Sequence, residues 1–285
     1  MFRKNSLVLW SSLTALLIAA VVCPVPAFAA SVGINYVGET NFGTFINPTE
    51  SAGVDPQQNW NNIASQAPGS VFVVPNLTKD TAGAGSPSGV KMSVQYNAAS
   101  ATVSGVITNE GATLDTPNRK LMQAYADVLG PVTGVPGTTS VTFEGLAGFG
   151  PFDLIIYNAG TIPPFQPDRV AEYEFYDGLT TAAPSLGSRL IRNKWNPVNV
   201  PNDAFKESLG DGTTAGTVEG NYIRIKNLNP SSGSLHIFAE GLTGSPQRGA
   251  LNGIQLIQVA AIPEPSTLAI CFMAFMLGVT LIRRP

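Results

Sequence analysis

The middle of the chain consists of short β-prone runs separated by clusters of Gly, Pro, Asn, Ser and Thr. Ala171, Tyr173 and Phe175 alternate with Glu172 and Glu174, a period of two that places apolar and acidic side chains on opposite faces of a strand. Many short strands with regular turns predict an all-β fold, a single antiparallel β-sandwich of the jelly-roll type. The predicted strands cover residues 32–37, 70–74, 90–96, 101–108, 140–144, 153–157, 169–176, 189–192, 222–226, 235–240 and 253–259.

One short helix is predicted between residues 116 and 130. Thr116 can cap its first turn, Pro117 suits the first helical position, and Gly130 can end it in the left-handed conformation. Apolar residues recur at helical spacing and form a single stripe, which is typical of an amphipathic helix. The stripe consists of Leu121, Met122, Tyr125, Val128 and Leu129.

Residues 1–29 have the three parts of a secretory signal peptide. Arg3 and Lys4 give a positive start, residues 7–22 are apolar, and a small-residue site follows two prolines. Signal peptidase is therefore expected to cut before Ala30. Cys23 leaves open a lipoprotein signal, although that pathway prefers a small residue before the cysteine and a valine stands there. The residues of the expected cleavage site are Ala27, Ala29 and Ala30.

At the other end, a Pro-Glu-Pro triplet precedes an apolar run at residues 267–282, and two arginines follow that run. A helix over this run is about 24 Å long, slightly less than a bilayer core of about 30 Å. The arginines are expected to stay on the cytoplasmic side, which leaves the bulk of the chain outside. The tail, residues 262–285, thus predicts a single membrane helix.

This tail resembles the PEP-CTERM sorting signal of bacterial exosortase substrates. The resemblance implies that an exosortase-like membrane transpeptidase processes the chain near the triplet. The final Pro285 and the small basic cluster depart from the usual pattern. Similar tails are also labelled "ice-binding protein C-terminal", but the chain has no regular threonine array of the kind that ice binding needs. The sorting residues are Pro263, Glu264, Pro265, Arg283 and Arg284.

Residues 30–261, the predicted exported domain, are long enough to bury one core. Without the terminal segments the chain has 12 Lys and Arg against 18 Asp and Glu, a net charge of about −6. This acidic balance argues against a nucleic-acid partner, which requires a basic face. Cys23 and Cys271 both lie in the terminal segments, so the domain must be stable without a disulfide.

Short apolar motifs in the domain are similar to an uncharacterised bacterial β-sandwich module, in outline like galactose-binding-like and malectin-like jelly rolls. The motifs are residues 33–38, 52–57 with 59–62, the Leu121-Met122 helix, and the closing strand at residues 251–256. The resemblance implies contact with a carbohydrate and no placed catalytic chemistry.

Trp60, Asn61 and Asn62 are the first candidates for glycan binding. An indole flanked by amides can stack on a sugar and bond its hydroxyls. The alternative is a core tryptophan whose neighbouring asparagines satisfy loop backbone, which is the commoner arrangement. Trp195, also between asparagines, is a second candidate with the same alternative.

Catalytic candidates are few. His236, the only histidine, is expected on the outward face of its strand as an exposed residue, since no G-x-S-x-G elbow supports a catalytic triad. Glu172 and Glu174 share one strand face and can in principle run glycoside hydrolysis, but such pairs are common on solvated faces. Asp203 and Asp211 can join a Ca²⁺ site, but a turn is preferred because no Ca²⁺-loop spacing occurs.

The sequence thus predicts an exported bacterial cell-surface or extracellular-matrix protein, not an enzyme, without cofactor or metal. Its β-sandwich is expected to be structural or adhesive, with a carbohydrate-binding module as the alternative and a glycan-active enzyme as a third function. The expected partners are signal peptidase, an exosortase-like transpeptidase, and an exopolysaccharide or another glycan. The chain would be held transiently at the inner membrane before it reaches the surface.

Overall fold

The computed structural model describes ten stretches of the chain. They are residues 29–37, 45–64, 70–95, 116–123, 125–129, 139–159, 169–193, 205–209, 220–242 and 248–259. All of them belong to one compact unit, Ala29–Val259. A second unit, Met1–Phe28 with Ala260–Pro285, lies outside the described residues.

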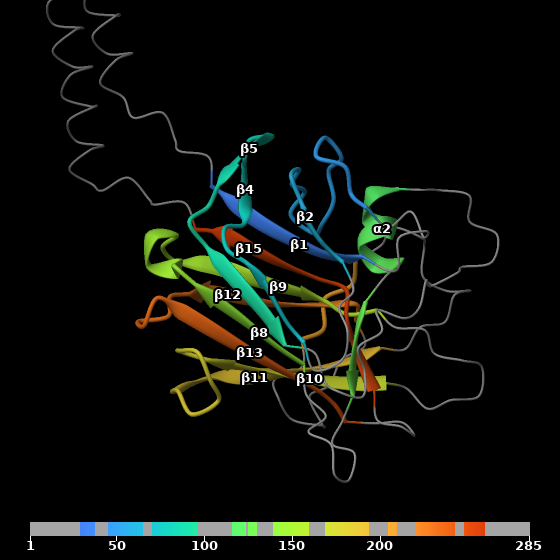
Figure 1. Cartoon of the computed structure of the whole chain (residues 1–285). Coiled ribbons are helices and arrows are strands. Elements are labelled where there is room, and N and C mark those ends of the chain that lie inside the picture. Colours follow the sequence, from blue (N-terminus) through green and yellow to red (C-terminus); the bar gives the residue numbers. More distant parts are fainter. Residues whose placement is uncertain are drawn as a thin grey trace, which may run out of the picture. The chain divides into compact units, whose positions relative to one another are not determined.

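A seven-stranded sheet forms one half of the domain (Figure 1). Its order is β12-β9-β15-β1-β4-β5, and β2 also pairs with β1. The strands are β1 (Ser31–Val37), β2 (Asn61–Ala64), β4 (Thr78–Thr81), β5 (Ala84–Pro87), β9 (Phe152–Tyr157), β12 (Tyr222–Leu228) and β15 (Gly253–Gln258).

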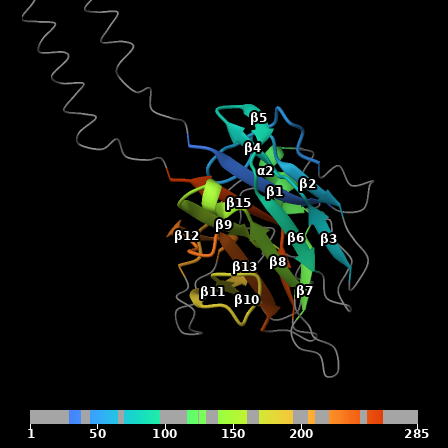
Figure 2. The same cartoon turned by 60° about the vertical axis from the view of Figure 1, so that its left-hand side comes forward.

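A six-stranded antiparallel sheet forms the other half, in the order β11-β10-β13-β8-β6-β3. Its strands are β3 (Val71–Val74), β6 (Lys91–Gln95), β8 (Thr139–Glu144), β10 (Arg169–Tyr176), β11 (Ser185–Asn193) and β13 (Ser234–Gly241). A short ribbon of β7 (Ala126–Leu129) and β14 (Arg248–Leu251) completes the strands. Figure 2 shows the two larger sheets in a second view. The predicted all-β sandwich with one short helix is confirmed.

The main core lies between the two sheets and takes alternate residues from each strand. Tyr173 and Phe175 of β10 face Leu154 and Ile156 of β9 across this core, and all four are at most 2% exposed. The predicted alternation in β10 is therefore confirmed, with Glu172 and Glu174 on the opposite face. Alternation of this kind lets each strand bury one row of side chains and leave the other to a different environment.

A second apolar cluster covers the outer face of the seven-stranded sheet. Residues 45–60, here called the cover segment, pack on this face together with helix α2 (Pro117–Gln123). The cluster consists of Ile46, Ala52, Trp60, Leu121, Ile155, Tyr157 and Tyr222. Central strands of this sheet are thus covered on both faces, which explains why consecutive residues of β1, β9 and β15 are buried along most of each strand.

The helix begins as predicted but ends early. Thr116 caps it, because its Oγ1 accepts a hydrogen bond from the Arg119 N–H at 3.3 Å, and Pro117 occupies the first helical position. The predicted continuation to residue 130 is wrong: the chain leaves the helix after Gln123 and enters β7 at Ala126. Pairing of β7 with β14 outweighs the helical stripe at positions 128 and 129.

One strand pair departs from the predicted antiparallel pattern. β2 runs parallel to β1, with Ile34 opposite Asn61 and Val37 opposite Ala64. A parallel pair requires a long connection, and the 23 residues between Val37 and Asn61 include the whole cover segment. The crossover therefore delivers the cover to the outer face of the sheet.

The two ends of the compact unit lie on adjacent strands. β1 and β15 are antiparallel neighbours, and Ser31 is opposite Ile257. The Gln258 N–H donates to the Ala30 carbonyl at 2.8 Å, and the Val259 N–H donates to the Pro151 carbonyl at 2.8 Å. Both ends are thus fixed in the sheet up to Ala30 and Val259.

Candidate functional site

Trp60 is a core residue of the cover segment. It is 5% exposed, and its indole Nε1 donates to the Gln57 carbonyl at 3.0 Å. Its ring meets the Tyr157 ring edge to face, with centroids 6.3 Å apart. Hence no indole face of Trp60 is presented for stacking on a sugar, and the core alternative describes this residue.

Asn61 and Asn62 are occupied by structural hydrogen bonds. The Asn61 amide donates to the carbonyls of Gly33 and Thr78 at 2.9 and 2.8 Å. The Asn62 amide donates to the Ile46 carbonyl at 2.9 Å and accepts from the Asn35 side chain at 2.8 Å. These amides join β1, β2, β4 and the cover segment, as the alternative of backbone-satisfying asparagines expects.

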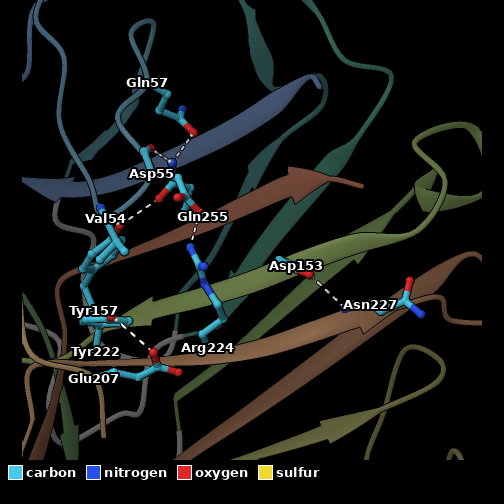
Figure 3. Close-up of polar contacts among 10 residues, drawn as sticks. All are labelled: Val54, Asp55, Gln57, Asp153, Tyr157, Glu207, Tyr222, Arg224, Asn227 and Gln255. Atoms are coloured by element: carbon cyan, nitrogen blue, oxygen red, sulfur yellow. Dashed lines mark hydrogen bonds and ion pairs between the residues drawn. The ribbon is translucent and has the colours of Figure 1, made fainter. Parts of the chain in front are cut away.

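A buried polar network fastens the cover segment to the sheet beneath it (Figure 3). The Tyr157 hydroxyl donates to Gln255 Oε1 at 2.8 Å and accepts from the Val54 N–H at 2.8 Å. Gln255 Nε2 in turn donates to the Asp55 carbonyl at 2.6 Å and to Gln57 Oε1 at 2.9 Å. Since these groups satisfy one another, the network is a structural clamp.

An ion pair and a hydrogen bond from a tyrosine hydroxyl extend the clamp along β12. Arg224 pairs with Asp55, and the Tyr222 hydroxyl donates to Glu207 Oε2 at 3.3 Å. Burial raises the pKa of Tyr157 well above its ordinary value, so the phenol stays protonated and keeps its donor role. Sequence reasoning did not single out these residues, although Asp55 and Gln57 belong to a motif that it used for the fold.

The outer face of the six-stranded sheet gathers the remaining candidates. Glu172, Glu174 and Tyr176 project from β10, and the register places Glu240, Phe238 and His236 of β13 opposite them in the same order. The Tyr176 hydroxyl donates to Glu174, and this bond is the main reason that the pKa of Tyr176 rises to about 12. Glu172 and Glu174 are half-buried on one face of a single strand, so they do not flank a sugar from two sides.

His236 lies on this face as predicted, but its predicted exposure is wrong. It is 8% exposed because Tyr176 and Thr142 stand beside it on neighbouring strands. Its Nδ1 is 3.0 Å from Thr142 Oγ1, and the Tyr176 ring centroid is 6.2 Å from that of the imidazole. Burial lowers the pKa of His236, so the ring is neutral at pH 7.

On this face, Glu240 is the carboxyl group whose pKa is shifted by its surroundings. Its pKa is raised, first by burial and then by the charges of Glu172 and Glu174. Two cations also belong to the face: Lys91 pairs with Glu144 at 2.6 Å, and Arg192 is opposite Val170, which is two residues before Glu172 on β10. Three carboxylates thus meet along the β10–β13 boundary.

Several predicted residues lie outside the described residues. They are Ala27, Trp195, Asp203, Asp211, Pro263, Glu264, Pro265, Arg283 and Arg284. Ala29 and Ala30 are described, at the start of the compact unit. Within the described stretches, no three His, Cys, Asp or Glu side chains are grouped to hold a metal ion. Nor does any helix in that part of the chain combine the length and apolar character needed to cross a bilayer.

Comparison with known proteins does not assign the chain to a family. No family model matches the chain, and no curated protein does. Among solved structures, the chain has a faint likeness to the enzymatically active domain of tailspike protein 4 from bacteriophage CBA120, with 12% identity and a TM-score of 0.19. The match covers 61% of this chain and 19% of the tailspike, and at that score it carries no argument.

Proposed function

We propose that this chain is an exported cell-surface or matrix protein, whose β-sandwich is released from a membrane tail by processing near Pro263-Glu264-Pro265. In this proposal the signal peptide is removed before Ala30 and residues 267–282 anchor the chain until an exosortase-like enzyme acts. The sandwich, of jelly-roll type, has a structural or adhesive role and no catalytic one.

The observation that supports the proposal is that backbone hydrogen bonds hold both ends of the sandwich, at Ala30 and at Val259. Ala30 already bonds Gln258 within the sheet, so removal of the preceding residues breaks no strand pair. Val259 bonds Pro151, and Pro263 follows only four positions later in the sequence. Cuts at both expected places therefore leave every described strand intact, as a protein that is processed after folding requires.

The test is the intact mass of the mature protein from its native host, with and without the exosortase-like enzyme. We expect a species that begins at Ala30 and ends near Pro263, present only when the enzyme is present. Replacing Pro263, Glu264 and Pro265 with alanine should leave the tail attached. A species that keeps Arg283 and Arg284 in both hosts would overturn the sorting proposal.

A second candidate function, binding a carbohydrate, is favoured by the outer face of the six-stranded sheet rather than by Trp60. That face combines aromatic rings, hydroxyls and carboxylates on neighbouring strands. Such a combination can both stack on a sugar ring and bond its polar groups.

A further inference from the structure

The outer face of the six-stranded sheet has a defined patch, called here the acidic–aromatic face. It consists of Glu172, Glu174, Tyr176, His236, Phe238 and Glu240. Cross-strand partners in an antiparallel pair lie about 5 Å apart, and alternate residues along a strand about 7 Å apart. The six side chains therefore form a two-column array, with carboxylates toward one end and aromatic rings toward the other.

His236 marks the array as more than a solvated surface. The side chain is only 8% exposed, and its Nδ1 is held by Thr142. No described residue bonds its Nε2. Nε2 is not among the buried atoms that lack a partner, so it keeps access to solvent and is available to a ligand hydroxyl or amine.

The charges on the face favour a cationic ligand. Glu172 is directly opposite Glu240, and Glu174 is two residues further along β10. No ion pair within the described residues neutralises these three, whereas Glu144 on the same sheet is paired with Lys91. Burial is the main cause of the raised pKa of Glu240, and the charges of Glu172 and Glu174 add to it; a bound cation would relieve this second part. The net charge of the domain, about −6, would attract the same ligand from a distance.

The aromatic rings of the face indicate what kind of ligand surface can pack against it. Tyr176 and Phe238 are half-buried on the outer face, beside His236 and next to the hydroxyls of Ser140 and Thr142. Aromatic faces attract ammonium groups and stack on flat apolar surfaces. A face with rings, hydroxyls and carboxylates suits linked sugar rings that carry amines, because such a polymer offers ring surfaces, hydroxyls and ammonium groups together.

From these observations, we propose that the acidic–aromatic face binds a cationic amino-sugar polymer, with the ammonium groups on Glu172, Glu174 and Glu240 and the rings against Tyr176 and Phe238. This inference deepens the adhesive role and rests on it for its biological setting. It does not depend on how the tail is processed.

The test uses the full-length chain in a non-ionic detergent at about pH 6 and low salt. Calorimetry compares a glucosamine hexamer, its N-acetylated counterpart and a lysine hexamer. We expect the glucosamine hexamer to bind at least about tenfold more tightly than the acetylated one, because acetylation removes the charge and leaves the rings. Added salt should weaken this binding.

Matched variants locate the binding. The pair Glu172→Gln with Glu240→Gln should weaken glucosamine-hexamer binding about tenfold or more. The pair Asp153→Asn with Glu207→Gln changes net charge equally, and neither residue belongs to a strand of the six-stranded sheet, so it should change affinity less than about twofold. Circular dichroism checks that both variants remain folded. The charge variants keep the size and shape of the side chains.

Four results would overturn the proposal. They are no binding of the glucosamine hexamer, equal binding of the acetylated hexamer, equal loss in both variant pairs, and equal or tighter binding of the lysine hexamer. The last would assign the face to a basic peptide. The calorimetry tests ligand binding by the face, whereas the mass measurement tests processing of the tail. A negative result in one experiment therefore does not contradict the proposal tested by the other.

Discussion

Single residues decide how the cover segment meets the sheet. Gly33 in β1 lies directly under Trp60, and a Cβ atom at this position would be 2.6 Å from the indole ring. Only a residue without a side chain permits that approach. The motif that contains Gly33 was used to predict the fold, and the structure supplies the packing reason for its glycine.

Replacing Gly33 with alanine should lower the free energy of unfolding by about 1–3 kcal/mol, because the indole and Gln57 must move. Gly148→Ala is the control, since nothing lies within 4 Å of a Cβ built there. That variant should change stability by no more than about 0.5 kcal/mol. Urea unfolding of both variants measures the difference, and equal effects would contradict the tight fit under Trp60.

Replacing Glu240 with glutamine should raise the free energy of unfolding, and the size of this gain should depend on pH. Since the folded-state pKa of Glu240 is raised, the ionised carboxylate destabilises the fold at neutral pH. The substitution should stabilise the protein at pH 7 by a few tenths to about 1 kcal/mol, the usual size of a cross-strand charge effect.

The sign follows from the protonation state. As the pH falls, the Glu240 carboxyl is protonated first in the folded state, where its pKa is raised, and then in the unfolded state. Below both pKa values the carboxyl is neutral in both states, so the stability advantage of glutamine disappears. Thermal unfolding from pH 7 down to about pH 3.5 measures the trend. A stability gain that persists at the acidic end would show that charge is not its cause.

Among the elements, the cover segment is held on the sheet by several separate contacts. Its contacts with the sheet combine the Trp60 ring, the Tyr157–Gln255 hydrogen bonds and the Arg224–Asp55 pair. Trp60→Ala should therefore cost about 3–5 kcal/mol. Trp60→Phe should cost less, since most of the buried apolar area remains.

Denaturant unfolding followed by tryptophan fluorescence, together with limited proteolysis, measures the stability of both Trp60 variants. If Trp60→Ala keeps full stability and loses affinity for a neutral glycan instead, the indole would be a binding surface and the core assignment would be wrong. The structure predicts the opposite, a loss of stability with no specific loss of binding.

Elements with one buried face could be predicted from the sequence because their alternation is local. β8, β10 and β13 lie within two residues of their predicted bounds. β7 and β14 could not, because each depends on a partner more than a hundred residues away. The acidic pair of β10 was visible in the sequence, but its completion by Glu240 depends on strand register, which composition does not reveal.

For the whole molecule, the structure predicts that residues 30–259 fold without the terminal segments. Every described strand and both apolar clusters lie between Ala30 and Val259. The melting temperature of this fragment should match that of the full chain in detergent to within about 2 °C, less than a 1 kcal/mol change would produce. A much lower value would mean that the terminal segments contribute to the fold.

The position of β15 also has a mechanical consequence. This strand lies between β9 and β1, and its last residues lead directly to the tail. A pull on Val259 against the body of the domain would load the backbone bonds to both neighbours in shear, so many bonds would resist together. A pull that separates Ala30 from Val259 would open the β1–β15 bonds one at a time. We therefore expect single-molecule force measurements to show a higher rupture force for the first geometry, a property suited to a surface protein held from one end.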